Sequence, residues 1–273
     1  MEFIEFQDQK IAFTDNGQKG TPVVFIHGYC EDLSMWDEFC EPFEEDYRLI
    51  KIDLPGFGKS EIKGKVSIAE MAEVVITVLR HLDIKKYIYI SHSMGGYVGL
   101  ELAKTEGKNL LGFGLFHSHP FADSEATKKK RHKGVEFIEQ NGSALYAKQL
   151  IPLLFKKDFH KSNHYLVAKL VYQASKSPKE GFINGQIAMS ERVDNTAILK
   201  ELECPVLMII GKQEQTAPYD LVVKQVDMPS LGSVHILEKV GHMGMFSAKK
   251  ETQKIVEDFL GFCALRLRSG LQG

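Results

Sequence analysis

Length, composition and charge place this chain among ordinary globular proteins. Of its 273 residues, 44% are hydrophobic, 26% are charged and 10% are aromatic, which suffices for one large core. With 34 Lys and Arg against 36 Asp and Glu, the formal net charge of −2 gives no overall field to attract nucleic acid or an anionic membrane surface. We therefore expect a small molecule as the partner.

The N-terminus and the cysteines indicate the cellular compartment. The first ten residues, "MEFIEFQDQK", are acidic and lack the apolar stretch of a signal peptide, and no apolar run approaches the ~18 residues of a membrane span. The four cysteines, at positions 30, 40, 204 and 263, have no short paired spacing, which argues against a zinc site or a disulfide framework. A cytoplasmic protein with free, buried thiols is expected.

The first 116 residues alternate strand-like and helix-like segments, as in an α/β sheet. Residues 3–7 and 10–17 are expected to pair as a hairpin, with "DNG" at 15–17 as the turn. Buried strands and one helix are then expected in chain order: strands within 22–28, 48–56 and 86–91, a helix at 94–105 and a strand within 110–118.

The pattern changes after residue 120. Residues 121–199 are mostly helical, charged and amphipathic, which predicts an inserted helical cap. Strand-like sequence returns at 204–211, where Pro205 marks the entry, and again at 233–242. Residues 249–267 then form an amphipathic helix. No internal repeat is present.

Two serines flank a histidine in "YIYISHSMGGYVG", residues 87–99. If Ser93 is a nucleophile, the chain must turn sharply from strand to helix, and the residues two before and two after it must be small. Ser91 and Gly95 meet that requirement. If Ser91 were the nucleophile, the ring of Tyr89 would collide inside the turn. Ser93 is therefore favoured, the alternative being a helix N-cap without chemistry.

Four further segments support a catalytic reading of this turn. The pair His27-Gly28 ends a strand upstream, so the N–H of Tyr29 could meet the N–H of Met94 in an oxyanion hole. The segment "DLPGFGKS" follows the next strand. Two later strands are followed by "GKQEQTAP" and "VGHMGMF", which supply an acid and a histidine in the order serine, acid, histidine.

On these motifs the chain resembles the α/β-hydrolase fold superfamily over nearly its whole length. The resemblance implies a mostly parallel, twisted sheet of about eight strands flanked by helices. It assigns residues 1–120 and 200–273 to the hydrolase core and residues 121–199 to the helical cap inserted in that core.

The same resemblance implies the roles of individual residues. Ser93 is the nucleophile, His242 the base, and the N–H groups of Tyr29 and Met94 are the oxyanion donors. The "DLPGFGKS" segment is a structural loop beside the site. No cofactor and no metal are required.

Two positions depart from the family pattern. Ser91 replaces the first glycine of the elbow, where small size is what matters, and Glu214 stands where aspartate is commonest. The position of Glu214 after the strand "PVLMIIG" favours it as the triad acid. The alternative is an exposed loop acid, with His242 oriented by a backbone carbonyl or by Asp220.

Other motifs have weaker functional readings. "GFGKS" does not match a phosphate-binding loop, because the required glycine five residues before Gly58 is Asp53. His117 and His119 in "FHSHP", like His160 and His164, lack supporting carboxylate or cysteine ligands, so metal binding is not expected. His117 and His119 either form a wall of the substrate pocket or belong to an ordinary surface loop.

Two segments of the expected cap could either bind a ligand or have a purely structural role. The basic run "KKKRHK", residues 128–133, is expected to be a solvated face of the cap rather than a patch for polyanions. The apolar run "LIPLLF", residues 150–155, is expected to pack the cap onto the sheet and also to line an acyl pocket.

The expected function is that of a serine hydrolase acting on a small ester, thioester or lactone through an acyl-enzyme, as a monomer or homodimer. An acyltransferase or a C–C bond hydrolase with the same triad remains open, as does a ligand-binding sensor on a hydrolase scaffold. Halide and epoxide chemistry are disfavoured because the elbow residue is Ser93 and not aspartate. The cap lacks the long apolar surface of a lipase, which favours short acyl chains.

Overall fold

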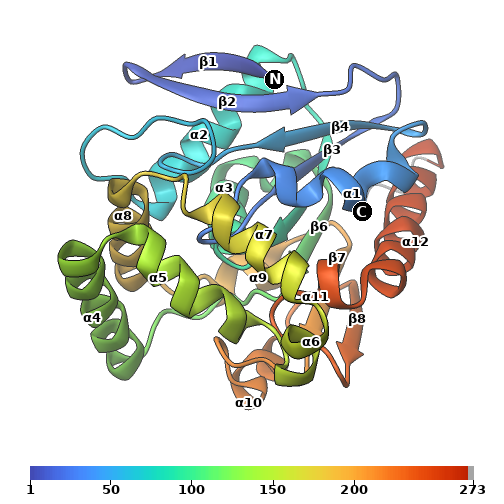
Figure 1. The fold of residues 1–273 in the computed structure, drawn as a ribbon. Helices are drawn as coiled ribbons and strands as arrows, with labels where there is room; N and C mark the ends of the chain where they lie inside the picture. The colour runs from blue at the N-terminus through green and yellow to red at the C-terminus, as the bar shows by residue number, and fades with distance from the viewer. Residues whose placement is uncertain (270–273) are drawn as a thin grey trace.

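The computed structural model describes residues 1–269, apart from the side chain of residue 157. One eight-stranded sheet forms its centre, in the order β1-β2-β4-β3-β5-β6-β7-β8, and β3 to β8 are all parallel (Figure 1). The strands are β1 Glu2–Phe6, β2 Gln9–Asp15, β3 Thr21–Ile26, β4 Tyr47–Ile52, β5 Tyr87–His92, β6 Leu110–Phe116, β7 Val206–Gly211 and β8 Gly232–Leu237. The predicted fold class and strand number are confirmed.

The central strands are mostly apolar because helices cover both faces of the sheet. Every residue of β5 and of β7 is buried. The strand order reverses between β4 and β5, which both pair with β3. In an open α/β sheet, ligands bind at the carboxyl ends of the strands beside such a switch point. The segment that follows β3 and the segment that follows β5 therefore meet there.

The N-terminal hairpin forms, but its turn was placed wrongly. β1 and β2 are antiparallel, and the two residues between them, Gln7 and Asp8, have φ angles of 47° and 60°. Two successive positive φ angles define the turn that matches the twist of a two-residue hairpin. The "DNG" at 15–17 instead ends β2, where Asn16 hydrogen-bonds to the backbone of Leu49 and Tyr47.

Helices flank the sheet and connect its strands. Those outside the β6–β7 connection are α1 Asp37–Cys40, α2 Ile68–His81, α3 Met94–Glu106, α10 Tyr219–Val222, α11 Gly244–Ser247 and α12 Lys249–Arg268. Helix α2 was not among the predicted elements, although a capping box marks its start: the hydroxyl of Ser67 accepts the N–H of Glu70, and the Glu70 carboxylate accepts the N–H of Ser67.

Six helices lie between β6 and β7, and we call them the inserted helices. They are α4 Glu125–Asn141, α5 Ser143–Leu150, α6 Lys157–Ser162, α7 His164–Ala174, α8 Lys179–Glu191 and α9 Thr196–Glu201. Figure 1 shows α4, α5 and α8 together on the side of the molecule away from α12. Within the run 150–155, Ile151, Leu154 and Phe155 are buried in the common core, as expected.

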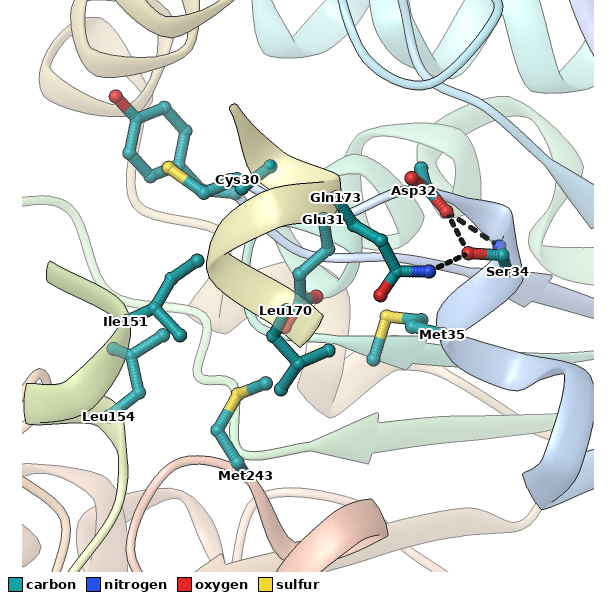
Figure 2. A pocket seen from close by; sticks show the side chains of 12 residues that line it. Cys30, Glu31, Asp32, Ser34, Met35, Ile151, Leu154, Leu170, Gln173 and Met243 are labelled. Carbon is teal, nitrogen blue, oxygen red and sulfur yellow. Dashed lines mark hydrogen bonds between the residues drawn. The ribbon is translucent and has the colours of Figure 1, made fainter. Parts of the chain in front are cut away.

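The inserted helices also contact the segment that follows β3. Gln173 of α7 donates a hydrogen bond to the hydroxyl of Ser34 at 3.2 Å, beside a narrow crevice between Leu170, Ile151 and Met243 (Figure 2). The crevice has a volume of about 20 Å³, which is space for roughly one water molecule. It is therefore too small to hold a substrate.

The four cysteines are free and buried, as expected. None of the helices within residues 1–269 combines the length and the apolar composition needed to cross a bilayer.

Candidate active site

Ser93 occupies a strained turn between β5 and α3. Its φ of 49° and ψ of −113° fall outside the regions that L-residues favour, as expected of a serine held on a sharp strand-to-helix elbow. A Cβ on Gly95 would lie only 2.7 Å from the carbonyl oxygen of His27 and 2.8 Å from that of Ile26. Only glycine therefore fits two residues after Ser93.

Ser91 has a structural position. It is fully buried within β5, and its hydroxyl donates a hydrogen bond to the carbonyl oxygen of Gly114 at 3.0 Å. The ring of Tyr89 stacks on Phe113, and its hydroxyl donates to the carbonyl oxygen of Gly95 at 2.8 Å. The additional hydroxyl at position 91 is thus satisfied without contacting the site.

A hydrogen-bonded chain joins the serine to a histidine and a carboxylate. His242 Nε2 lies 2.8 Å from Ser93 Oγ, and His242 Nδ1 lies 2.6 Å from Glu214 Oε2. The Glu214 side chain is 4% exposed, so it is not the exposed loop acid of the alternative reading. Ser93, Glu214 and His242 follow β5, β7 and β8, so the carboxyl edge of the sheet brings them together.

Thr216, which was not among the predicted site residues, contacts the Glu214 carboxylate. The N–H of Thr216 donates to Glu214 Oε1 at 2.9 Å, and the Thr216 hydroxyl also contacts Oε1. The same hydroxyl lies 3.0 Å from His242 Nδ1. Glu214 therefore uses one oxygen for Thr216 and the other for the imidazole.

The charges of this pair stabilise each other. Burial alone would raise the pKa of the Glu214 carboxyl, but the charge and hydrogen bond of His242 outweigh burial and lower that pKa below its usual range. Burial alone would lower the pKa of His242, and Glu214 raises it above the ordinary value. The carboxylate is therefore ionised and favours the imidazolium form of His242.

His117 lies beneath the Glu214–His242 pair. Its ring is buried, and its two nitrogens face the backbone N–H groups of Gly211 and Gly244, each at 3.2 Å. Burial lowers the pKa of His117 well below its usual value, so the ring is neutral and accepts a hydrogen bond from one of these groups. Since Gly211 precedes Glu214 and Gly244 follows His242, the ring supports both loops.

A second buried acid–histidine pair, Glu31 and His92, lies beside the elbow. Glu31 Oε2 accepts the N–H of Gly28 at 2.6 Å and lies 2.8 Å from His92 Nδ1, and His92 Nε2 lies 2.8 Å from the carbonyl oxygen of His242. The pair links the segment after β3, the elbow and the histidine loop. This pair was not predicted, because Glu31 and His92 are 61 residues apart in the sequence.

The segment after β3 lies directly against the serine. A Cβ on Gly28 would be 3.1 Å from Ser93 Cβ, so the backbone that leads into Tyr29 passes beside the elbow. Met94 begins α3, so its N–H is one of the helix-start donors without a partner in the helix. Gly28, the residue before Tyr29, and Met94 therefore both adjoin Ser93.

Asp53 of "DLPGFGKS" stabilises the neighbouring loop. Its carboxylate accepts the N–H groups of Leu33 and Lys59 at 2.7 and 2.8 Å, and burial raises its pKa to about 6. A Cβ on Gly58 would collide with this carboxylate at 2.2 Å. The loop is built around a buried acid and does not resemble a phosphate cradle.

A cavity of about 320 Å³ opens onto Ser93, His117 and His242. Its walls combine aromatic and aliphatic side chains with a few polar ones, the usual composition of a small-molecule site. The larger apolar members are Tyr29, Tyr97, Tyr146, Leu150, Leu154 and Met189.

His119 does not belong to the described wall of this cavity. Its ring stacks on Phe121 and packs edge-on against Tyr97, with Tyr97 Oη 3.4 Å from its Nε2. Burial lowers the pKa of His119 to about 3, so the ring is neutral. Of the two histidines proposed for the pocket wall, His117 lies there and His119 lies behind Tyr97. Residues 1–269 contain no group of three or more His, Cys, Asp or Glu arranged to hold a metal.

Comparison with known proteins agrees with this geometry. Residues 21–113 match the family model described as alpha/beta hydrolase fold. The chain is 25% identical over 212 residues to 3-oxoadipate enol-lactonase 1 of Acinetobacter baylyi, covering 76% of this chain and 77% of that protein. It is 24% identical to 2-hydroxy-6-oxononadienedioate/2-hydroxy-6-oxononatrienedioate hydrolase of Cupriavidus pinatubonensis, covering 92% of this chain and 91% of that protein.

A solved structure extends the similarity to the whole fold. A thermophilic esterase from Thermogutta terrifontis, with malate bound, superimposes with a TM-score of 0.88 at 26% identity, covering 94% of each chain. The order of the strands, the strained serine elbow and these similarities agree. The chain has the α/β-hydrolase fold, and its residues 21–113 match the model of that family.

Proposed function

We propose that the protein is a serine hydrolase that cleaves a small carboxylic ester, thioester or lactone through an acyl-enzyme. The hydrogen-bonded chain from Ser93 through His242 to Glu214, open to a cavity at the elbow, carries the proposal. The relatives named as an enol-lactonase and an esterase support the same reaction type.

The proposed mechanism uses each group of the chain. Ser93 Oγ attacks the carbonyl carbon while its proton passes to His242 Nε2, and the N–H groups of Tyr29 and Met94 hold the oxyanion. The tetrahedral intermediate then collapses, the bond to the leaving atom breaks, and that atom, the oxygen of an ester or lactone or the sulfur of a thioester, takes the proton from His242. Water attacks the acyl-enzyme by the same route, with His242 as base. Glu214 orients the imidazole and stabilises its charged form.

We further propose that the inserted helices form a cap that determines which substrates fit. Tyr146 and Leu150 of α5, Leu154, and Gln186 and Met189 of α8 line the cavity that holds Ser93. A cavity of about 320 Å³ is near the lower limit for ligand sites, at roughly 300 Å³. A small substrate fits this volume.

The test compares the wild type with Ser93→Ala on short-chain esters, with trapping of the acyl-enzyme by acid quench and mass spectrometry. Turnover by the wild type, an acyl adduct on Ser93 and loss of both in the variant are expected. Turnover that persists in Ser93→Ala would contradict the proposal, as would a folded wild-type protein that neither turns over an ester nor forms an adduct.

A C–C bond hydrolase is the second candidate, and the relative named as a 2-hydroxy-6-oxononadienedioate hydrolase favours it. Parallel assays of aryl esters, thioesters and β-diketones separate the two reactions. A kcat/KM for a β-diketone above that for every ester would replace the first proposal with the second.

A further inference from the structure

The cavity beside Ser93 has an unbalanced charge. Its described lining contains two permanently charged side chains, Lys130 and Arg131, and no Asp or Glu. Both cations come from α4, in the basic run that was expected to be a solvated face. That expectation is wrong for Arg131, whose side chain is 18% exposed and points into the fold.

A single buried acid is shared between two arginines. The Asp123 carboxylate pairs with Arg131 Nε through Oδ2 and with Arg192 Nη1 through Oδ1, the latter at 2.6 Å. Burial alone would raise the pKa of Asp123, but the two guanidinium groups outweigh it and lower that pKa, so the acid is ionised. One negative charge against two positive charges leaves a surplus of one positive charge.

The two arginines differ in whether their terminal Nη nitrogens have close hydrogen-bond partners in the protein. Arg192 is 2% exposed, donates from Nη1 and Nη2 to the carbonyl oxygens of Met189 and Phe121 at 2.7 and 2.9 Å, and lies 3.9 Å over the ring of Tyr97. Its role is structural. In Arg131, Asp123 occupies only Nε.

The outer fork of Arg131 remains available. Its Nη1 makes one long contact, 3.4 Å, to Gln186 Oε1, and Nη2 has no partner among the side chains that the structure describes. Gln186 also lines the cavity, and its amide nitrogen donates to the hydroxyl of Tyr146 at 2.7 Å. A planar fork of two N–H donors in a cavity wall matches the geometry of a carboxylate.

We propose that Arg131, assisted by Lys130, binds a carboxylate of the substrate, so that the enzyme prefers esters or lactones that carry a second, ionised acid group. This inference rests on the proposed hydrolase function and specifies its substrate class. The other acid near the reacting atoms, Glu214, is paired with His242 and Thr216 and is 4% exposed. It therefore leaves the cations of α4 to bind the substrate.

The test uses pairs of substrates matched in size that differ in charge. Monoethyl glutarate is compared with ethyl pentanoate, which places the charge on the acyl side, and 4-acetoxybenzoate with 4-acetoxybenzamide, which places it on the leaving-group side. The kcat/KM of each is measured for the wild type, Arg131→Gln and Arg131→Lys. Lys129→Gln is the matched control, because Lys129 is an exposed cation of the same helix outside the described cavity wall.

The anionic member of at least one pair is expected to be preferred by the wild type. Arg131→Gln should lower kcat/KM for that substrate roughly 10- to 100-fold, mainly through KM, as expected for a lost charge-assisted hydrogen bond. Arg131→Lys should retain part of the preference, and Lys129→Gln should retain all of it. Turnover of the neutral esters should stay within about threefold of the wild type in Lys129→Gln, and Arg131→Gln should lower it by a smaller factor than it lowers turnover of the anionic partners.

A wild type that hydrolyses the neutral member of both pairs as well as the anionic one would overturn the inference and leave the proposed function intact. The same holds if Arg131→Gln stays folded and keeps the preference. If Arg131→Gln fails to fold, inhibition of the wild type decides. Glutarate should then compete with ethyl pentanoate more strongly than glutaramide does, and equal inhibition would refute the carboxylate site.

Discussion

Replacing Glu214 with glutamine keeps the shape of the side chain and removes the negative charge that faces His242. The surrounding contacts determine how the new amide is oriented. Thr216 presents its backbone N–H to the Oε1 position at 2.9 Å, and a donor there requires an acceptor. The glutamine carbonyl oxygen therefore takes that position, and its NH₂ group faces His242 Nδ1.

An NH₂ group facing Nδ1 favours the wrong tautomer of the imidazole. Nδ1 then becomes the acceptor, and the proton sits on Nε2, which must accept the proton of Ser93. The charge that stabilised the imidazolium is lost as well. At the 2.6 Å separation of Nδ1 and Oε2, Coulomb's law with an effective dielectric constant of ~20 gives an attraction of roughly 6 kcal/mol between the two charges. We take this value as the upper limit of the imidazolium stabilisation that the substitution removes.

We expect kcat to fall 10²–10⁴-fold with little change in KM, a loss of about 3–5 kcal/mol of transition-state stabilisation. The pH profile should also move. His242 acts as a base only when neutral, so activity falls as pH drops through its pKa, and Glu214 raises that pKa. Glu214→Gln should therefore shift the acid limb of kcat/KM to lower pH.

The assay is steady-state hydrolysis of a short aryl ester between about pH 5 and 9, a range that spans the ordinary pKa of histidine. Circular dichroism confirms that the variant is folded. Glu238→Gln is the control, because Glu238 is 67% exposed, pairs with Lys212 and is outside the described cavity wall. A folded Glu214→Gln protein that keeps more than about a third of the wild-type kcat, a barrier change below ~1 kcal/mol, would show that Glu214 is not the triad acid.

Three further outcomes are expected. A fluorophosphonate probe should label Ser93 and spare Ser91, whose hydroxyl is buried against Gly114; peptide mapping that finds the label elsewhere refutes the assignment. Glu31→Gln should lower the free energy of unfolding at neutral pH by about 3–5 kcal/mol, because it leaves His92 buried without its charged partner. Since the folded-state pKa of Glu31 is lowered despite burial, that stability is present above the unfolded-state pKa and is lost as pH falls through the folded-state value; equal denaturation midpoints at neutral pH would contradict this. Activity on p-nitrophenyl esters should decrease as the acyl chain lengthens beyond what a cavity of about 320 Å³ accommodates, and a maximum on long-chain emulsions would contradict the cap proposal.

Local patterns in the sequence determined most of the fold and the candidates for the site. A strand such as β7 is a continuous apolar run because both of its faces are buried, and this pattern can be recognised without knowing the neighbouring strands. The elbow could be identified because a sharp turn restricts the residues on either side of Ser93 to small ones. Glu214 and His242 could be named because each lies in a loop near the end of strand-like sequence, three residues beyond the end of β7 and five beyond the end of β8.

The hairpin turn is an element that local residue preferences did not predict correctly. Asn and Gly at 16–17 carry a strong turn signal, yet Gln7 and Asp8 form the turn, since pairing of β1 with β2 forces their positive φ angles. Here the register of the sheet outweighed residue preference.

Only the tertiary structure decided which polar groups face one another. The contact of Thr216 with His242, that of Glu31 with His92 and the division of Asp123 between Arg131 and Arg192 join residues from separate elements, and no spacing in the chain encodes them. The sequence likewise could not say that His117 borders the cavity while His119 lies behind Tyr97. A basic run on a helix has the same composition whether its side chains face water or a substrate, because the packing of α4 against α8 determines which of them turns inward.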